Sequence, residues 1–307
     1  MLLSRPIFII GCNRSGTTLL FRNLSEHPRL WSMYIEAQEV FYRYFPRDDR
    51  LGDRVTDGMG SRGYARAIER ELFRLSNNKE AFLNHRVLRY VPRKFLQRPV
   101  GRLYRVPPIR LVEKTPANSM RIPWLARAFP QARFVYITRR PEPTISSLME
   151  GWKLWNHQRA DEPFHFRKWH YLAPPGWRDW TGRSLAEICA FQWTESNRIA
   201  LEDLESHAPD RFIRIRHEDL LKDPAGMYAM IAAFCELEWD AQLDRVILGT
   251  DSRVFTTGGS LPRPGKWKEL HGAEIEAVRP MFEAVQSRLY DGVVQAAMSD
   301  AAGVRSA

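Results

Sequence analysis

The chain has 307 residues, of which 44% are hydrophobic and 27% are charged, as is usual for a globular protein with a sizeable core. Its formal net charge of +10 favours anionic partners, but no helix-turn-helix, zinc-finger or RNA-binding pattern indicates nucleic acid as the primary partner. No signal-type cleavage site and no run of roughly 20 apolar residues is present, so we expect a cytoplasmic protein without a transmembrane segment.

The predicted elements alternate between β-branched apolar runs and stretches with helical patterning. In chain order they are strand Ile7–Ile10, helix Thr17–Ser25, helix Tyr64–Arg74, strand Ile109–Val112, helix Ile122–Ala128, strand Phe134–Thr138, helix Pro143–Met149, helix Ser184–Glu205, strand Phe212–Arg216, helix Pro224–Phe234 and helix Gly272–Gln286. This alternation predicts an α/β fold with a P-loop-like central parallel β-sheet flanked by helices. Ligands of such sheets bind at the carboxyl ends of the strands, so the loops there are expected to converge.

Two segments interrupt this alternation. Residues 47–110 are basic and contain a glycine cluster, and residues 151–182 are rich in Trp, His, Arg and Pro with little periodicity. We interpret both as loop or helix insertions within a single domain that covers residues 1–307. The small, polar tail at 299–307 is expected to fray.

The loop after the first strand has the spacing of a phosphate-binding loop. Gly11 and Gly16 enclose four residues and a helix follows, a geometry that directs backbone N–H groups and a helix N-terminus toward an anion. Thr17 stands where nucleotide hydrolases carry a lysine that reaches the β- and γ-phosphates, whereas Arg14 and Ser15 lie inside the loop. These differences favour an anionic ligand that is not hydrolysed as ATP is.

A second anion-binding pattern follows the strand Phe134–Thr138. Arg139 comes directly after the strand, Pro141 opens a helix, and Ser147 follows Arg139 by eight residues. A guanidinium can bind two phosphate oxygens at once, and a hydroxyl near the start of a helix adds a third donor. Taken alone, the pattern also describes a surface arginine at a strand end and a serine on an exposed helix face; only together with the first loop does it favour a second phosphate site.

These two motifs resemble those of sulfotransferases that use 3′-phosphoadenosine-5′-phosphosulfate (PAPS), in the branch that includes bacterial and protein-tyrosine sulfotransferases. The first loop matches their 5′-phosphosulfate motif, and the second pattern matches the motif that holds the 3′-phosphate. The resemblance implies that PAPS is the sulfate donor, that no metal is required, and that the donor is bound by Arg14, Ser15, Gly16, Thr17, Thr18, Arg139 and Ser147. Three separated cysteines and the lack of an acidic cluster agree with the absence of a metal.

Weaker similarities extend the match to about residue 270. Residues 214–224 are similar to a family element that follows a strand, but His217 replaces its usual tyrosine. Pro264-Gly265-Lys266-Trp267 resembles a late family segment that closes over the nucleotide, which implies that Lys266 reaches the 3′-phosphate. A structural tryptophan beside a solvated lysine is the alternative.

Sulfuryl transfer needs a base for the acceptor proton and cations around the transferring group. The resemblance implies that Arg14 and Lys114, which lies just past the strand Ile109–Val112, are the catalytic cations. Glu36 follows Arg14 by 22 residues, a spacing similar to that of the catalytic glutamate in this branch, and is our candidate base. Glu39 and a histidine such as His27 remain alternatives.

The only sequence feature that indicates the acceptor is the group of aromatic residues in the 151–182 insertion. Their rings could stack on a sugar, so we expect a hydroxyl acceptor, or an amine, on a carbohydrate or glycoconjugate. Packing that pins a long loop is the alternative role for these rings, and phenols or small metabolites are the second acceptor class. A kinase-like phosphotransferase and a non-catalytic polyanion-binding protein remain rival functions, and the sequence leaves the oligomeric state open.

Overall fold

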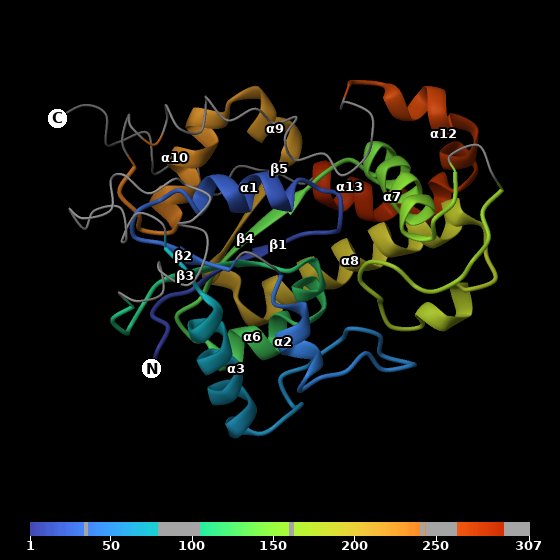
Figure 1. The fold of residues 1–307 in the computed structure, drawn as a ribbon. Helices are drawn as coiled ribbons and strands as arrows, with labels where there is room; N and C mark the ends of the chain where they lie inside the picture. The colour runs from blue at the N-terminus through green and yellow to red at the C-terminus, as the bar shows by residue number, and fades with distance from the viewer. Residues whose placement is uncertain (34–35, 79–104, 160–162, 240–242, 244–262, 292–307) are drawn as a thin grey trace.

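The central element of the fold is a five-stranded parallel sheet in the order β2-β3-β1-β4-β5 (Figure 1). It is seen in a computed structural model, which describes residues 1–33, 36–78, 105–159, 163–239, 243 and 263–291. The strands are β1 Ile7–Ile10, β2 Trp31–Ser32, β3 Leu111–Lys114, β4 Arg133–Thr138 and β5 Phe212–Arg216. This arrangement confirms the predicted α/β class with a parallel sheet.

Three predicted strands occur within one residue of their expected bounds, and the fourth, Ile109–Val112, is present but its bounds are shifted by two residues. The strand begins at Leu111 and ends at Lys114, because its pairing with β1 joins Ile7 to Val112 and Ile9 to Lys114. Ile109 forms only an isolated bridge with Leu3. Lys114 therefore lies on the last residue of β3 rather than past the strand.

Helices connect and cover the strands. They are α1 Thr17–Leu24, α2 Gln38–Tyr42, α3 Arg62–Leu75, α6 Ile122–Ala128, α7 Pro141–Trp155, α8 Leu185–His207, α9 His217–Lys222, α10 Pro224–Phe234, α12 Lys266–Ala277 and α13 Arg279–Tyr290. The prediction of one helix over Gly272–Gln286 is wrong. The chain leaves helical geometry at Val278, and Pro280 lies in the first turn of α13, where its missing N–H is tolerated.

The helices form two layers around the sheet. Figure 1 shows α1, α9 and α10 on one face of the sheet and α2, α3, α6 and α8 on the other. The two faces of β1 belong to two separate apolar clusters: Ile7 and Ile9 pack with α1 and α10, whereas Phe8 and Ile10 pack with α6 and α8. Burial on both faces explains the continuous apolar run of this strand.

Helices α7, α12 and α13 lie together at the carboxyl edge of the sheet, where α7 packs against α8 and α12 (Figure 1). The segment predicted as the insertion 47–110 contains α3, and that at 151–182 contains the last turn of α7 and a short 3-10 helix at Trp177–Trp180. The predicted frayed tail at 299–307 lies outside the described residues. The carboxyl edge thus faces helices from both halves of the chain.

Candidate functional site

The loop between β1 and α1 is a tight turn held by its own hydrogen bonds. The backbone N–H and the Oγ of Ser15 both donate to the carbonyl of Cys12, at 3.2 and 2.6 Å. Arg14 and Gly16 have φ angles of 70° and 96°, and a Cβ on Gly16 would approach His217 to 2.3 Å. Glycine is therefore required where α1 begins, and Gly16, Thr17 and Thr18 at that helix end line the cavity described below.

Arg14 and Ser147 join the two phosphate motifs. Nε of Arg14 donates to Oγ of Ser147 at 2.9 Å, from the first loop to α7. Arg139 follows β4 and donates from Nη1 to the carbonyl of Arg14 at 3.0 Å. Burial lowers the pKa of the Arg139 guanidinium from its usual value, and the nearby Arg14 charge acts in the same direction. Two like charges held this close favour an anion between them.

Glu36 and Lys114 form an ion pair at the end of β3. The Lys114 side chain is 8% exposed and that of Glu36 is 44% exposed, so the pair joins a buried cation to a carboxylate open to the solvent. Of the two alternative bases, Glu39 is exposed on α2 and does not line the cavity described below. His27 is buried, with Nε2 2.8 Å from the carbonyl of Glu238, and also lies away from that cavity.

Lys266 opens α12 and reaches across to α7. Its Nζ donates to both carboxylate oxygens of Glu150 at 3.0 Å, and the two side chains are 18% and 35% exposed. The lysine predicted to hold the 3′-phosphate is thus on the wall of the same site, paired with a carboxylate.

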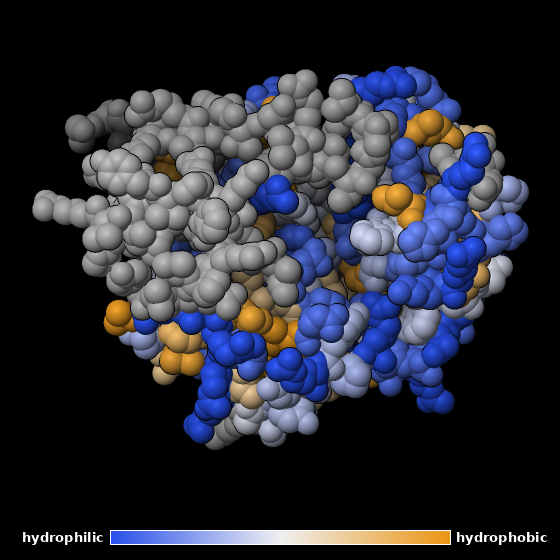
Figure 2. All heavy atoms as spheres, in the orientation of Figure 1, coloured by the Kyte–Doolittle hydropathy of each residue, from blue (hydrophilic) through white to orange (hydrophobic). Residues whose placement is uncertain are grey.

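A cavity of about 1090 Å³ connects these groups. Its lining includes nine of the residues predicted from the sequence, namely Arg14, Gly16, Thr17, Thr18, Glu36, Lys114, Arg139, Ser147 and Lys266. Ser15 is the exception: its side chain is buried inside the loop, where it stabilises the turn. Figure 2 shows that hydrophilic side chains predominate on the described part of one molecular face, with apolar residues in separate patches.

His217, which replaces the expected tyrosine, packs against the first loop and lines the cavity. Burial, with a smaller contribution from the charge of Arg139, lowers its pKa to about 3. The imidazole is therefore neutral at physiological pH and adds no cation to the site.

The aromatic residues of the 151–182 segment mostly pack against one another. Trp152, Trp169 and Trp177 are buried, and Trp169 contacts the other two in edge-to-face geometry at centroid distances of 5.4 and 5.3 Å. Trp155, by contrast, is 55% exposed and lines the cavity, as Tyr171 does. Packing therefore accounts for most of these tryptophans, and of the Trp, Tyr and Phe rings in the described part of this segment only those of Trp155 and Tyr171 line the cavity.

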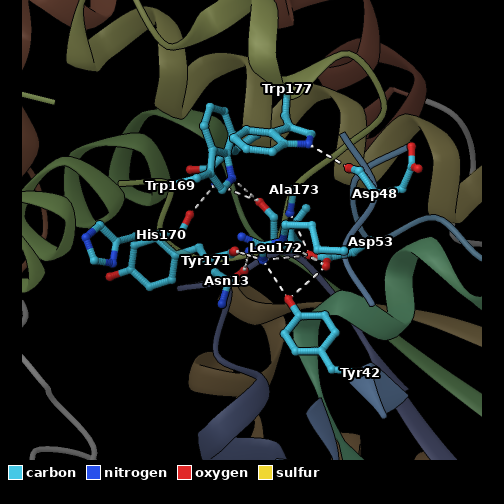
Figure 3. A network of polar contacts seen from close by, with 12 residues as sticks. Asn13, Tyr42, Asp48, Asp53, Trp169, His170, Tyr171, Leu172, Ala173 and Trp177 are labelled. Carbon is cyan, nitrogen blue, oxygen red and sulfur yellow. Dashed lines mark hydrogen bonds and ion pairs between the residues drawn. The ribbon is translucent and has the colours of Figure 1, made fainter. Parts of the chain in front are cut away.

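Asp53 is the centre of a polar network that the sequence did not reveal (Figure 3). Its carboxylate accepts hydrogen bonds from Tyr42 at 2.8 Å, from Arg47 at 3.0 and 3.1 Å, and from the backbone N–H of Ala173 at 2.7 Å. Arg47 also donates to the carbonyl of Tyr171 at 2.8 Å. These bonds fix the segment that presents Tyr171 to the cavity, and no local motif marks the residues that make them.

Among the described residues there is neither a metal-binding cluster nor a helix that could span a membrane. Within the described residues, no group of three or more His, Cys, Asp or Glu side chains is arranged to hold a metal ion. None of the described helices has both the length and the apolar character that crossing a bilayer would need. The three cysteines are free and buried.

Known proteins resemble this chain over most of its length. Protein-tyrosine sulfotransferase A of Caenorhabditis elegans is 24% identical over 294 residues, which cover 90% of this chain and 65% of that protein. An uncharacterized protein of Aquifex aeolicus is 24% identical over 246 residues, which cover 79% of this chain and 26% of that protein. The chain thus spans less than two thirds of the length of either relative.

Solved structures share the fold. Sulfotransferase STF9 from Mycobacterium avium superimposes with a TM-score of 0.51 at 15% identity, over 93% of this chain and 76% of that chain. Mouse sulfotransferase SULT7A1, complexed with PAP, gives a TM-score of 0.48 at 14% identity, over 93% of this chain and 85% of that chain. A model of the sulfotransferase family matches residues 6–241. Because that match covers most of the chain, the protein belongs to the sulfotransferase family.

Proposed function

We propose that the protein transfers a sulfuryl group from PAPS to a hydroxyl group of an acceptor. The observation that carries the proposal is the hydrogen bond from Arg14 to Ser147, which brings the two phosphate motifs together on one cavity. A nucleotide with phosphates at both its 5′ and 3′ positions needs such a site with two anion-binding ends. Membership of the sulfotransferase family supports the same donor.

The residues present fit PAPS in charge and in space. Arg14, Arg139, Lys114 and Lys266 line the cavity together with the N-terminus of α1, so both ends of a polyanionic nucleotide meet positive charge. The volume of about 1090 Å³ is at the upper limit of common ligand sites, which leaves room for an acceptor beside the donor.

Four groups would share the transfer step. Glu36 takes the proton of the acceptor hydroxyl as the acceptor oxygen forms its bond to sulfur. Lys114 and the N-terminus of α1 stabilise the negative charge that collects on the 5′-phosphate oxygen as its bond to sulfur breaks. Arg14 holds the transferring group between them. The ion pair of Glu36 with Lys114 supports these roles, because it places the base next to the cation of the leaving oxygen.

We propose a carbohydrate or glycoconjugate as the acceptor. The support comes from Trp155 and Tyr171, two rings with a flat apolar face and a polar edge on the cavity wall. An amine on such a molecule would meet the same base. Phenols, including tyrosine peptides, are the second class, since a flat aromatic acceptor can use the same two rings.

An array of acceptors incubated with radiolabelled PAPS tests the acceptor class. Neutral and acidic oligosaccharides, glycolipids, simple phenols and tyrosine peptides form its arms, and label in the sugar-containing arms is the expected result. Label confined to phenols or peptides would reject the carbohydrate while keeping the reaction.

Thermal shift tests the donor independently of the acceptor. Stabilisation by 3′,5′-adenosine bisphosphate (PAP) without magnesium, but not by ATP with magnesium, is expected. The reverse result would favour a kinase-like phosphotransferase. Stabilisation by heparin or DNA, with no shift from either nucleotide, would favour a non-catalytic polyanion-binding protein.

A further inference from the structure

A buried group of four polar side chains lies beneath the Glu36–Lys114 pair. All four come from one nine-residue stretch that runs from the end of β3 through the 3-10 helix Pro116–Met120. They are at most 1% exposed, and we call them the platform: Glu113, Thr115, Asn118 and Arg121. None of them lines the cavity, so they cannot act by touching a substrate.

The platform holds the backbone next to Glu36. The N–H of Ala37, the residue after Glu36, donates to Oγ1 of Thr115 at 2.8 Å and to Oε1 of Glu113 at 3.3 Å. The Thr115 hydroxyl in turn donates to the same Glu113 oxygen. Because Ala37 is fully buried, this N–H has no solvent to replace those acceptors.

The platform also supports the other end of α2. Asn118 bridges the two charges, since its Nδ2 donates to Glu113 at 2.6 Å and its Oδ1 accepts from Arg121 at 3.3 Å. The Arg121 guanidinium lies over the rings of Phe41 and Tyr42 at 4.6 and 5.7 Å. The helix that begins just after Glu36 is thus fixed at its start by hydrogen bonds and at its end by cation–π contacts.

Burying two charges for packing alone is unfavourable. Apolar residues of similar volume commonly stabilise a protein at least as well as a buried ion pair does. Burial raises the pKa of Glu113 to about 7, and the nearby charge of Glu36 acts in the same direction, whereas Lys114 opposes it. Within the described residues, Nε and Nη2 of Arg121 have no hydrogen-bond partner. The buried charges of Glu113 and Arg121 are therefore better explained by a need to hold the neighbouring backbone in place than by a gain in folding stability.

We propose that Glu113, Thr115, Asn118 and Arg121 are positioning residues that hold Glu36 opposite Lys114 through the backbone of Ala37. The proposal rests on the proposed function for the role of Glu36, but the geometry it describes can be measured without turnover. Its consequence is that changes in the platform lower kcat while leaving the donor site intact. Small displacements of a catalytic group can reduce turnover about 100-fold.

Thr115 offers a matched pair of variants. Thr115→Val keeps the volume and removes the hydroxyl, whereas Thr115→Ser keeps the hydroxyl. Hydrogen–deuterium exchange is measured on peptides that contain Ala37, with peptides from α8 as the internal reference. We expect faster exchange at Ala37 in Thr115→Val and Glu113→Gln, little change in α8, and restoration toward wild-type exchange in Thr115→Ser.

Kinetics completes the test. Turnover is followed as PAP released from PAPS, with the best acceptor of the array or, without one, with water as the acceptor. We expect kcat to fall about 10- to 100-fold in Thr115→Val and Glu113→Gln, with the KM for PAPS and the thermal shift by PAP close to wild type. Thr115→Ser should recover most of the kcat.

Wild-type exchange at Ala37 in both Thr115→Val and Glu113→Gln would overturn the proposal. So would a loss of PAP binding that matches the loss of kcat, because that result indicates general disruption. If Glu113→Gln does not fold, the Thr115 pair decides alone. If the wild-type protein releases no PAP from PAPS but Ala37 behaves as expected, the proposed function fails while the backbone restraint stands.

Discussion

Nε of Arg14 donates to Oγ of Ser147 over 2.9 Å, although 133 residues separate them in the chain. The bond joins the loop after β1 to the second turn of α7, and Arg139 braces the same loop through the carbonyl of Arg14. These hydrogen bonds connect the two ends of the proposed donor site directly. Removing a cation at one end should therefore also change the position of the groups at the other end.

Arg139→Ala should weaken PAP binding about 10- to 100-fold, because it removes the proposed charge-assisted contact with the phosphate and the observed hydrogen bond to the carbonyl of Arg14. Titration calorimetry measures the change. Arg140→Ala is the matched control, since the Arg140 guanidinium lies over the ring of Tyr290 at 4.9 Å, and its loss should alter affinity less. Equal losses in both variants would indicate that only net charge matters at this edge.

Elements of the fold could be predicted where a single hydrophobic pattern marked them clearly. Both β1 and β5 were predicted with their observed bounds: β1 is a continuous apolar run buried on both faces, whereas in the edge strand β5 isoleucines alternate with arginines. The bounds of β3 could not be predicted in the same way, because they depend on its pairing with β1, and the residues of β3 alone do not reveal that pairing. The two-residue β2 carries too little pattern to be recognised, and the break at Val278 competes with helical periodicity on both sides.

The motifs placed Arg14, Arg139 and Lys114 at the ends of strands, and the structure brings all three to one cavity, whereas their roles stay predictions. Glu113 was missed as a separate group, because a glutamate before a lysine looks like a solvated pair until the fold shows it to be buried. Glu150 was missed for a related reason: its partner Lys266 is 116 residues away. Tertiary pairing determines the roles of both carboxylates.

Glu36→Gln should spare PAP binding and lower kcat about 100-fold or more, because the amide cannot accept the acceptor proton. Steady-state kinetics with PAPS, beside a thermal shift with PAP, separates the two effects. Glu39→Gln is the control, as Glu39 is exposed and lies off the cavity. Turnover retained in Glu36→Gln would assign the base elsewhere, and its loss in Glu39→Gln would identify the replacement.

If Lys266 binds the 3′-phosphate as proposed, Glu150→Gln should strengthen PAP binding, because the lysine would no longer have to leave the Glu150 carboxylate to reach the phosphate. An ion pair of this partial exposure contributes about 1 kcal/mol, so a gain of several-fold is expected. Lys266→Met should weaken binding in the same titration. The double variant should resemble Lys266→Met alone, since the carboxylate acts through the lysine. A weaker affinity in Glu150→Gln would contradict this competition.

His217 should make the unfolding free energy depend on pH between about 3 and 6.5. Burial and the charge of Arg139 lower its pKa to about 3 in the folded protein, so below 6.5 the unfolded chain takes up a proton that the folded protein does not. Stability from this residue is therefore complete above pH 6.5 and is lost as the pH falls toward 3, with a slope approaching about 1 kcal/mol per pH unit.

The pKa of Glu113 is raised to about 7, so the stability that Glu113 contributes falls as the pH rises. This contribution is the same in the wild type and in a His217 variant, and it cancels when the two are compared. Urea unfolding of wild type and His217→Phe at pH 7.0, 5.5 and 4.5 isolates the histidine as the difference between the two curves. Parallel curves would mean that the imidazole takes up its proton inside the folded protein, next to Arg139, and the cavity would then carry one more positive charge toward a phosphate than its structure indicates.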